Sequence, residues 1–182
     1  MSLQTVSGQT IIEPVTLDAL KSRIKLTSTA DDAQLTGLIT AGREFAERIS
    51  NRCLAHRQFI EYRDNFPWPS HGLLIPRPPL VSVDLVEYME DDYQTWTAWD
   101  PTEYWVALNN VPAILQPRKG FTYPAALGQT PGCVRITFTA GETNPLPQHW
   151  QLNLQDITVF MYENAGVPVP TNLVTIPKIH YF

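Results

Sequence analysis

The chain has 182 residues, a formal net charge of −5 at pH 7 and 43% hydrophobic residues. This length and hydrophobic content suit one globular domain with a real core, and they exclude a disordered polypeptide. Charged residues make up only 17%, which indicates a surface suited to assembly, although the many aromatic residues also suit a core. No block of lysine and arginine is present, so the chain lacks the basic patch typical of nucleic-acid-binding proteins.

The sequence carries no targeting or membrane signal. Its first fifteen residues, MSLQTVSGQTIIEPV, contain neither a basic segment nor a long apolar run, so we expect no signal peptide. No stretch approaches the length of a membrane span, and we expect no membrane partner. Cys53 and Cys133 form no motif and are expected to be buried thiols in a reducing compartment. Together these features predict a soluble protein made in a cytoplasm.

Apolar residues at helical spacing predict two helices near the start. The first begins at Thr16, which can cap it, and runs to about Leu26. The second runs from about Asp31 to Asn51, and Gly42 in its apolar stripe would let a neighbouring helix approach closely. Its other side carries four charged residues that are expected to be exposed: Arg43, Glu44, Glu47 and Arg48.

A block of strands is predicted over residues 56–144. The segment 133–141 alternates most clearly, with Val134, Ile136 and Phe138 on one face. Extended segments are also predicted at 57–66, 81–99, 104–107 and 113–116, and the segment 81–99 is expected to turn at Asp91–Asp92. The prolines of the Pro-Arg-Pro-Pro sequence at 76–79 cannot pair inside a sheet, so they are expected to form a corner that leads from the helical core into the strands.

The segment 145–166 returns to a helical pattern. It is apolar nearly all round, so it should be buried on more than one side, against the first two helices or against another subunit. We therefore expect an α+β fold: a small helical bundle of two N-terminal helices and a C-terminal helix, with an inserted antiparallel β subdomain and an extended C-terminal tail. The expected boundaries are an N-terminal arm at 1–14, a single domain at 15–166 with helical core 15–55 and 145–166 and β insertion 56–144, and a tail at 167–182.

The residues give little support for chemistry. None of the four histidines is paired at metal-ligand spacing, and no nucleotide-binding or nucleophile motif occurs. The acidic Glu90, Asp91 and Asp92 fit a soluble turn better than a divalent-ion site. Trp96, Trp99 and Trp105 fit sheet packing better than a sugar-stacking platform. We expect no catalytic residue, no metal and no cofactor, and hence no enzyme.

Three segments in this order resemble a known family. They are LLIPRPPLVSVDLVEYME at 73–90, PGCVRITFTAG at 131–141 and a final helix ending in FMYENAG at 160–166. With the two leading helices, they resemble the head–tail connector (adaptor) proteins of long-tailed bacteriophages and prophages. The resemblance covers about 15–166 and does not extend to the tail.

The resemblance implies a structural virion protein. Such proteins assemble about a dozen copies into a ring beneath the portal, extend the DNA channel and join the head to the tail or its stopper. It implies the virion neck as location, the host cytoplasm during assembly, and as partners other copies of the chain, the portal protein and a tail or stopper protein. DNA would be only passing cargo, since repeated negative charge around a channel repels phosphate. The residues Arg43, Glu44, Glu47 and Arg48 are candidates for one subunit interface, and the strand block for the other.

Two alternatives remain for the tail. Its apolar anchors would dock on the portal, or the tail would add a strand to its own sheet. The candidate anchors are Leu173, Ile176, Ile179, Tyr181 and Phe182. Two rival functions are a tail-completion or tail-terminator protein and, from another class, a small hydrolase or carbohydrate-binding module.

Overall fold

The computed structural model describes residues 2–67, 71–90, 95–125 and 131–179. The chain divides into two compact units. A β unit is made of Met1–Thr10 and His56–Gly141, and a helical unit of Ile11–Ala55 and Glu142–Phe182. The described residues form helices and antiparallel sheets, which confirms the predicted α+β class. The prediction that the strand block projects toward neighbouring subunits stays a prediction. The predicted boundaries of the arm, the insertion and the tail stay predictions as well.

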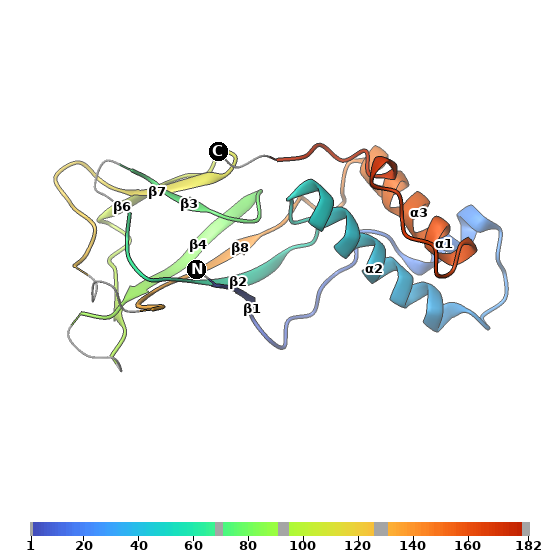
Figure 1. The fold of residues 1–182 in the computed structure, drawn as a ribbon, viewed down its shortest axis with the longest axis horizontal. Helices are drawn as coiled ribbons and strands as arrows, with labels where there is room; N and C mark the ends of the chain where they lie inside the picture. Colours follow the sequence, from blue (N-terminus) through green and yellow to red (C-terminus); the bar gives the residue numbers. More distant parts are fainter. Residues whose placement is uncertain (1, 68–70, 91–94, 126–130, 180–182) are drawn as a thin grey trace. The chain divides into compact units, whose positions relative to one another are not determined.

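The helical unit holds three α-helices and one short 3-10 helix among its described residues (Figure 1). These are α1 (Leu17–Ile24), α2 (Asp32–Ser50), α3 (Gln148–Glu163) and the 3-10 helix η1 (Thr171–Leu173). Thr16 caps α1 as predicted, since its Oγ1 accepts a hydrogen bond of 3.2 Å from the Ala19 N–H. Two left-handed residues, Lys25 and Asn51, end α1 and α2.

The predicted close approach at Gly42 is confirmed. A Cβ added to Gly42 would lie 2.9 Å from Thr158 Oγ1 and 3.5 Å from Ile157 Cγ2, both on α3. Any larger side chain would therefore push α3 away from α2. The apolar stripes of the helices, with residues of the tail, enclose one core: Val15, Leu20, Leu35, Ile39, Ala46, Leu54, Leu146, Trp150, Leu154, Ile157, Val174 and Ile176.

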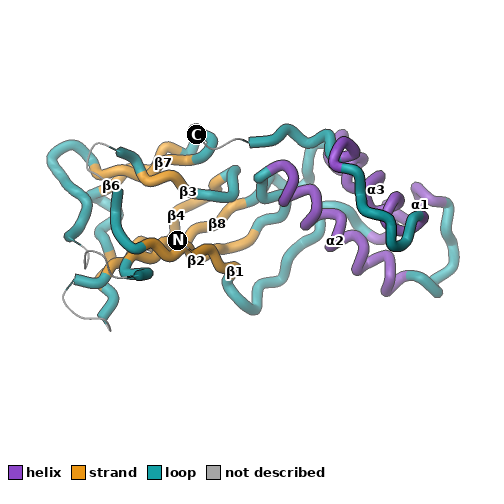
Figure 2. Tube along the Cα trace, in the orientation of Figure 1, coloured by secondary structure: helices purple, strands orange, loops and turns teal. Residues whose placement is uncertain are grey.

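The β unit contains two antiparallel sheets (Figures 1 and 2). The five-stranded sheet has the order β1 (Ser2–Thr5), β2 (Arg57–Arg63), β8 (Val134–Ala140), β4 (Leu80–Tyr88) and β5 (Thr97–Ala98). The three-stranded sheet has the order β3 (Leu73–Ile75), β7 (Ala113–Pro117) and β6 (Tyr104–Ala107). The alternation predicted for β8 is confirmed, because Val134, Ile136 and Phe138 are fully buried while the residues between them are half-buried.

The proline corner has a different role from the predicted one. It joins β3 of the three-stranded sheet to β4 of the five-stranded sheet, so it moves the chain between two sheets of one unit. Arg77 has a left-handed φ of 60°, and the Pro78–Pro79 bond is cis. The prediction that the corner leads out of the helical core was wrong, because β2 and β3 already precede it.

The segment predicted at 81–99 contains β5 and all of β4 except its first residue, Leu80. These strands pair through Glu87 with Ala98 and Tyr88 with Thr97. The turn predicted at Asp91–Asp92 lies outside the described residues. Trp99 is 2% exposed and contacts the rings of Phe66, Tyr104 and Tyr123 at centroid distances of 4.8–5.7 Å. Because Trp99 is core, it is unavailable to a sugar-stacking platform, and the packing interpretation is confirmed for this residue.

One carboxylate lies in the interior of the β unit. Glu61 on β2 pairs with Ile136 of β8 and is 0% exposed. Its Oε1 accepts from Arg63 Nε at 3.0 Å, whereas Oε2 has no hydrogen-bond partner among the described residues. Burial raises the pKa of the Glu61 carboxyl above its ordinary value, against the opposing effect of the Arg63 charge.

We expect the stability contributed by Glu61 to be fully present below its unfolded-state pKa of about 4.5 and to be lost as pH rises through the raised folded-state pKa. The variant Glu61→Gln, which stays neutral, should therefore gain stability relative to the unmodified chain as pH rises above 4.5. The gain should be about 1.4 kcal/mol per unit of pKa difference. Urea denaturation across this pH range measures it, with the exposed Glu163→Gln as control. A difference that does not change with pH would contradict this assignment.

Candidate assembly surfaces

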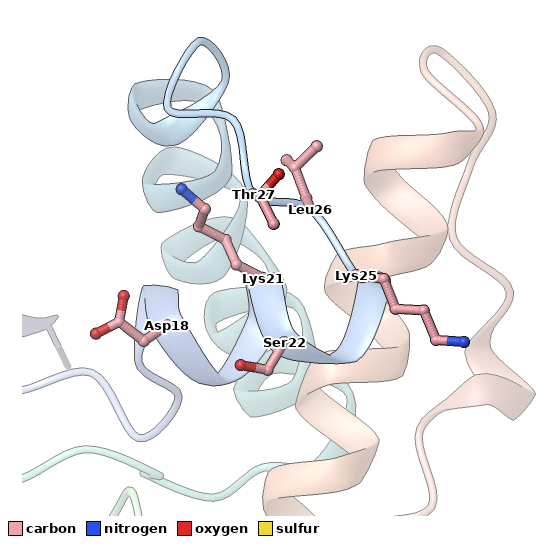
Figure 3. A pocket seen from close by; sticks show the side chains of 6 residues that line it. All are labelled: Asp18, Lys21, Ser22, Lys25, Leu26 and Thr27. Carbon is pink, nitrogen blue, oxygen red and sulfur yellow. The ribbon is translucent and has the colours of Figure 1, made fainter.

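The side chains that line the pocket beside α1 are not arranged as a catalytic site (Figure 3). It is lined by Asp18, Lys21, Ser22, Lys25, Leu26 and Thr27. Asp18 and Lys25 point to opposite sides of α1, and Lys21 Nζ is engaged at 2.6 Å by Asp32 Oδ1. A reaction centre requires groups that converge on one point, and these do not.

Neither a metal cluster nor a membrane span is found in the part of the chain that the structure describes. No group of three or more His, Cys, Asp or Glu residues is placed there to hold an ion. No helix there has both the length and the apolar character needed to cross a bilayer.

The predicted interface on α2 is only partly exposed. Glu44 and Arg48 lie on the surface, and Arg48 stacks over the Phe45 ring at 5.4 Å. Arg43 and Glu47 are only 2% and 3% exposed, so the prediction that these two side chains are exposed was wrong. An interface role for Glu44 and Arg48 stays a prediction.

Arg43 is instead the centre of a buried ion-pair network. Its Nε donates to Glu13 Oε2 at 2.8 Å and its Nη1 donates to Glu47 Oε2 at 3.1 Å. Glu13 also accepts from Thr40 Oγ1, and Glu47 Oε1 accepts from the Leu54 N–H at 2.8 Å. Burial opposes the charge, but the hydrogen bond to Glu13 and the nearby carboxylates outweigh it, so the pKa of Arg43 lies above its ordinary value. The network joins the segment before α1 and the segment after α2 to the middle of α2.

The C-terminal segment belongs to the helical unit. Thr171–Ile179, which we call the strap, runs along α3 as a loop after the 3-10 helix (Figure 2). Val174, Ile176 and Ile179 are 9%, 2% and 8% exposed, and Leu173 packs against the same core. No described residue of the strap forms a strand, so the alternative of an added sheet strand is not observed there. Ile176 and Ile179 are buried within the chain, and docking of the tail on the portal stays a prediction. Tyr181 and Phe182 lie outside the described residues.

Polar contacts hold the backbone of the strap. Asn153 Nδ2 donates to the Leu173 carbonyl at 2.6 Å, and Asn153 Oδ1 accepts from the Thr175 N–H at 3.1 Å. At the other end, the Ile179 N–H donates to Ser50 O at 2.9 Å and Asn51 Nδ2 donates to the Ile179 carbonyl at 3.0 Å. The strap thereby satisfies the last carbonyl of α2, which has no partner within the helix.

The two sheets of the β unit present different outer faces. On the five-stranded sheet, the Asp84 carboxylate accepts from Gln58 and Thr139, and Arg135 is paired with Glu87. Such a network suits contact with water. On the three-stranded sheet, the cross-strand register places five uncharged residues on one face: Leu74, Ile114, Ala107, Gln116 and Trp105. Leu74 and Trp105 are 38% and 50% exposed, whereas Ala107 is buried, and sequence reasoning did not identify this face.

The outer strands of the three-stranded sheet are capped by arginine side chains. Arg63 Nη2 donates to the Leu74 carbonyl on β3, and Arg118 Nε donates to the Tyr104 carbonyl on β6 at 2.9 Å. In the observed register both carbonyls point away from β7, toward the open edges of the sheet. A further strand would have to displace these arginines, so this sheet offers a partner its face more readily than its edges.

No protein-family model and no curated protein matches the chain by sequence. Solved structures match it by fold over the whole length. A chain from the neck of an empty gene transfer agent (GTA) particle, computed with C6 symmetry, has a TM-score of 0.80 at 16% identity. Chains from the virion of a native GTA particle and from the neck of a native GTA particle computed with C12 symmetry have TM-scores of 0.73 and 0.70, each at 18% identity.

All three matches cover 100% of this chain and 98% of the matched chain. The resemblance predicted from the sequence is thereby confirmed at the level of the fold. The chain has the fold of proteins found in the neck and virion of phage-like particles.

Replacing Arg43 by methionine should destabilise the helical unit by about 3–5 kcal/mol, because the carboxylates of Glu13 and Glu47 would lose their buried partner. The matched change Arg48→Met, at an exposed position of the same helix, should stay within about 0.5 kcal/mol. Chemical denaturation followed by circular dichroism measures both. Equal effects of the two substitutions would show that the network does not hold the unit together.

Replacing Ile176 by alanine should cost about 2–5 kcal/mol, since the side chain is 2% exposed in the core that the strap shares with the helices. Lys178→Ala, at an exposed strap position, should leave the unfolding midpoint nearly unchanged. Thermal unfolding provides the comparison. An unchanged midpoint for Ile176→Ala would mean that the strap is not part of the core.

Proposed function

We propose that the chain is a structural protein of the neck of a phage-like particle, where it acts as a head–tail connector. The observation that carries the proposal is the fold match to a neck chain at a TM-score of 0.80, with nearly complete coverage of both chains. A match confined to one unit would be compatible with many functions, whereas this one includes both the helical unit and the β unit.

The proposed assembly is a ring of about twelve copies. Its support is that the matched neck chains come from particles computed with C6 and C12 symmetry. A closed ring needs two different complementary patches on each copy, because each subunit contacts its two neighbours through different surfaces. The outer face of the three-stranded sheet, with Leu74 and Trp105 exposed and no charged residue, is our candidate for one patch. The exposed side of α2 at Glu44 and Arg48 remains a candidate for another.

In this role the ring would lie beneath the portal, lengthen the DNA channel and receive the tail or its stopper. The net charge of −5 suits a surface past which DNA slides, because repeated carboxylates repel phosphate. Partners are thus other copies of the chain, the portal protein and a tail or stopper protein. Assembly would take place in the host cytoplasm. An enzymatic role finds no support in the described residues, where the pocket beside α1 brings no reactive groups together.

Deleting the gene for this chain from a phage or prophage genome should yield filled heads that lack attached tails, because the joint between them is missing. Negative-stain images of the particles measure this, and a plasmid copy of the gene should restore tailed particles. A gold label on a tagged copy should lie at the neck. Tailed particles in the deletion strain, or a label elsewhere on the particle, would contradict the proposed function.

A further inference from the structure

The groove that holds the strap recognises an extended peptide by its backbone. The side-chain amide of Asn153 donates to one backbone group and accepts from another two residues further on, and it is only 5% exposed. Ser50 and Asn51 form the equivalent pair of contacts with Ile179. Between these contacts, the core accepts aliphatic side chains at Val174 and Ile176. The groove therefore selects an extended segment with aliphatic residues at the spacing of 174, 176 and 179.

The connection between α3 and the strap is a reversal with few contacts. After α3 ends at Glu163, the chain turns at Gly166, whose φ is +83°, and the Val167 N–H donates to the Asn164 carbonyl at 3.0 Å. Val167 is 54% exposed. Pro168 and Pro170 follow, and their fixed φ favours an extended chain over further turning. Opening this reversal would let the strap move away from α3, with loss of the core contacts of Val174 and Ile176 until another strap replaces them.

We propose that the groove is an exchange site in which the helical unit of one copy receives the strap, residues 171–179, of a second copy. Every contact between strap and groove is the same whether the strap belongs to the same chain or to an identical one. The two arrangements differ in the connection 164–170, where the Val167 N–H donates to the Asn164 carbonyl and Val169 packs against the core. Exchange of an identical element is a low-cost route to association between copies.

Geometry and concentration decide which copy supplies the strap. The segment 164–170 spans at most about 24 Å when fully extended, so donor and acceptor must be adjacent copies. In a free chain, the short connection holds the strap near its own groove at about millimolar effective concentration. In an assembly, the groove of an adjacent copy is held as near to the strap as the groove of the strap's own chain. The strap's own groove then no longer has a higher effective concentration of strap than the adjacent groove. If every copy passes its strap to the next, the contact is heterologous and closes after a full turn of a ring.

This inference rests on the proposed function for its place in a ring, but exchange between two copies is tested independently. Isotopically heavy and light full-length chains, each with the photo-crosslinking residue benzoylphenylalanine at the exposed position 178, are mixed at the highest concentration that the chain tolerates and irradiated. Mass spectrometry should find heavy–light crosslinks between position 178 of one chain and residues 46–54 of the other. If position 178 crosslinks to this segment only within chains of the same isotope, the exchange proposal is overturned.

A complementation experiment gives a second measurement. The variant Asn153→Ala has a damaged groove and an intact strap, whereas Ile176→Asp has a damaged strap and an intact groove. Mixed full-length chains with different tags should form a hetero-complex that neither variant forms alone, because one intact strap can enter one intact groove. In the matched control, Lys178→Asp replaces Ile176→Asp, and the complex should be lost because each copy keeps its own strap in place.

The outcomes separate this inference from the proposed function. No hetero-complex, or equal amounts with Ile176→Asp and Lys178→Asp, would overturn strap exchange. If either variant fails to fold, the crosslinking of unmodified groove and strap decides alone. A chain that localises to the neck but shows no heavy–light crosslinks would keep its proposed function and lose the exchange mechanism.

Discussion

The helical unit depends on covering an apolar helix that no single neighbour can cover. On α3, Trp150, Leu154 and Ile157 are buried, and Thr158 lies against the backbone of α2 at Gly42. The strap covers α3 at Asn153 and contributes aliphatic residues to the same core. Because α2 and the strap come from distant parts of the sequence, the unit is complete only when both ends of the chain are in place. Its stability is therefore a property of the whole chain.

Periodicity was a reliable guide to the elements themselves. The alternation in 133–141 and the apolar stripe of 31–51 gave β8 and α2 nearly to the residue, since each pattern reflects one buried face. Periodicity did not predict which segments of the chain contact the other faces of these elements. Arg43 and Glu47 lie away from the stripe, yet Glu13 and the Leu54 N–H approach them from segments outside the helix. A helical wheel describes one helix, so it cannot reveal such contacts.

The sequence also left the place of the tail open for a physical reason. Alternating aliphatic residues and prolines fit a sheet edge, a partner or a groove between helices equally well. What decides is a polar residue elsewhere: Asn153, in the middle of a nearly apolar helix, can hold the donor and acceptor of an extended backbone. A polar residue, Asn153, among the apolar residues predicted to be buried on this helix was the available signal. The apolar face of the three-stranded sheet was harder to foresee, because which side of β3, β6 and β7 is buried depends on how the two sheets pack.

The arginine caps on β3 and β6 also bear on how the protein behaves before it meets its partners. An uncapped strand edge is a template on which identical chains stack into fibres, and the hazard grows with the number of copies in the cell. Arg63 and Arg118 each bond one carbonyl on these two edges, which hinders backbone pairing there, while Leu74 and Trp105 on the face of the sheet stay exposed. Contact through that face then depends on side chains that match in shape. Such contact binds a complementary neighbour more tightly than other proteins and therefore disfavours non-specific aggregation.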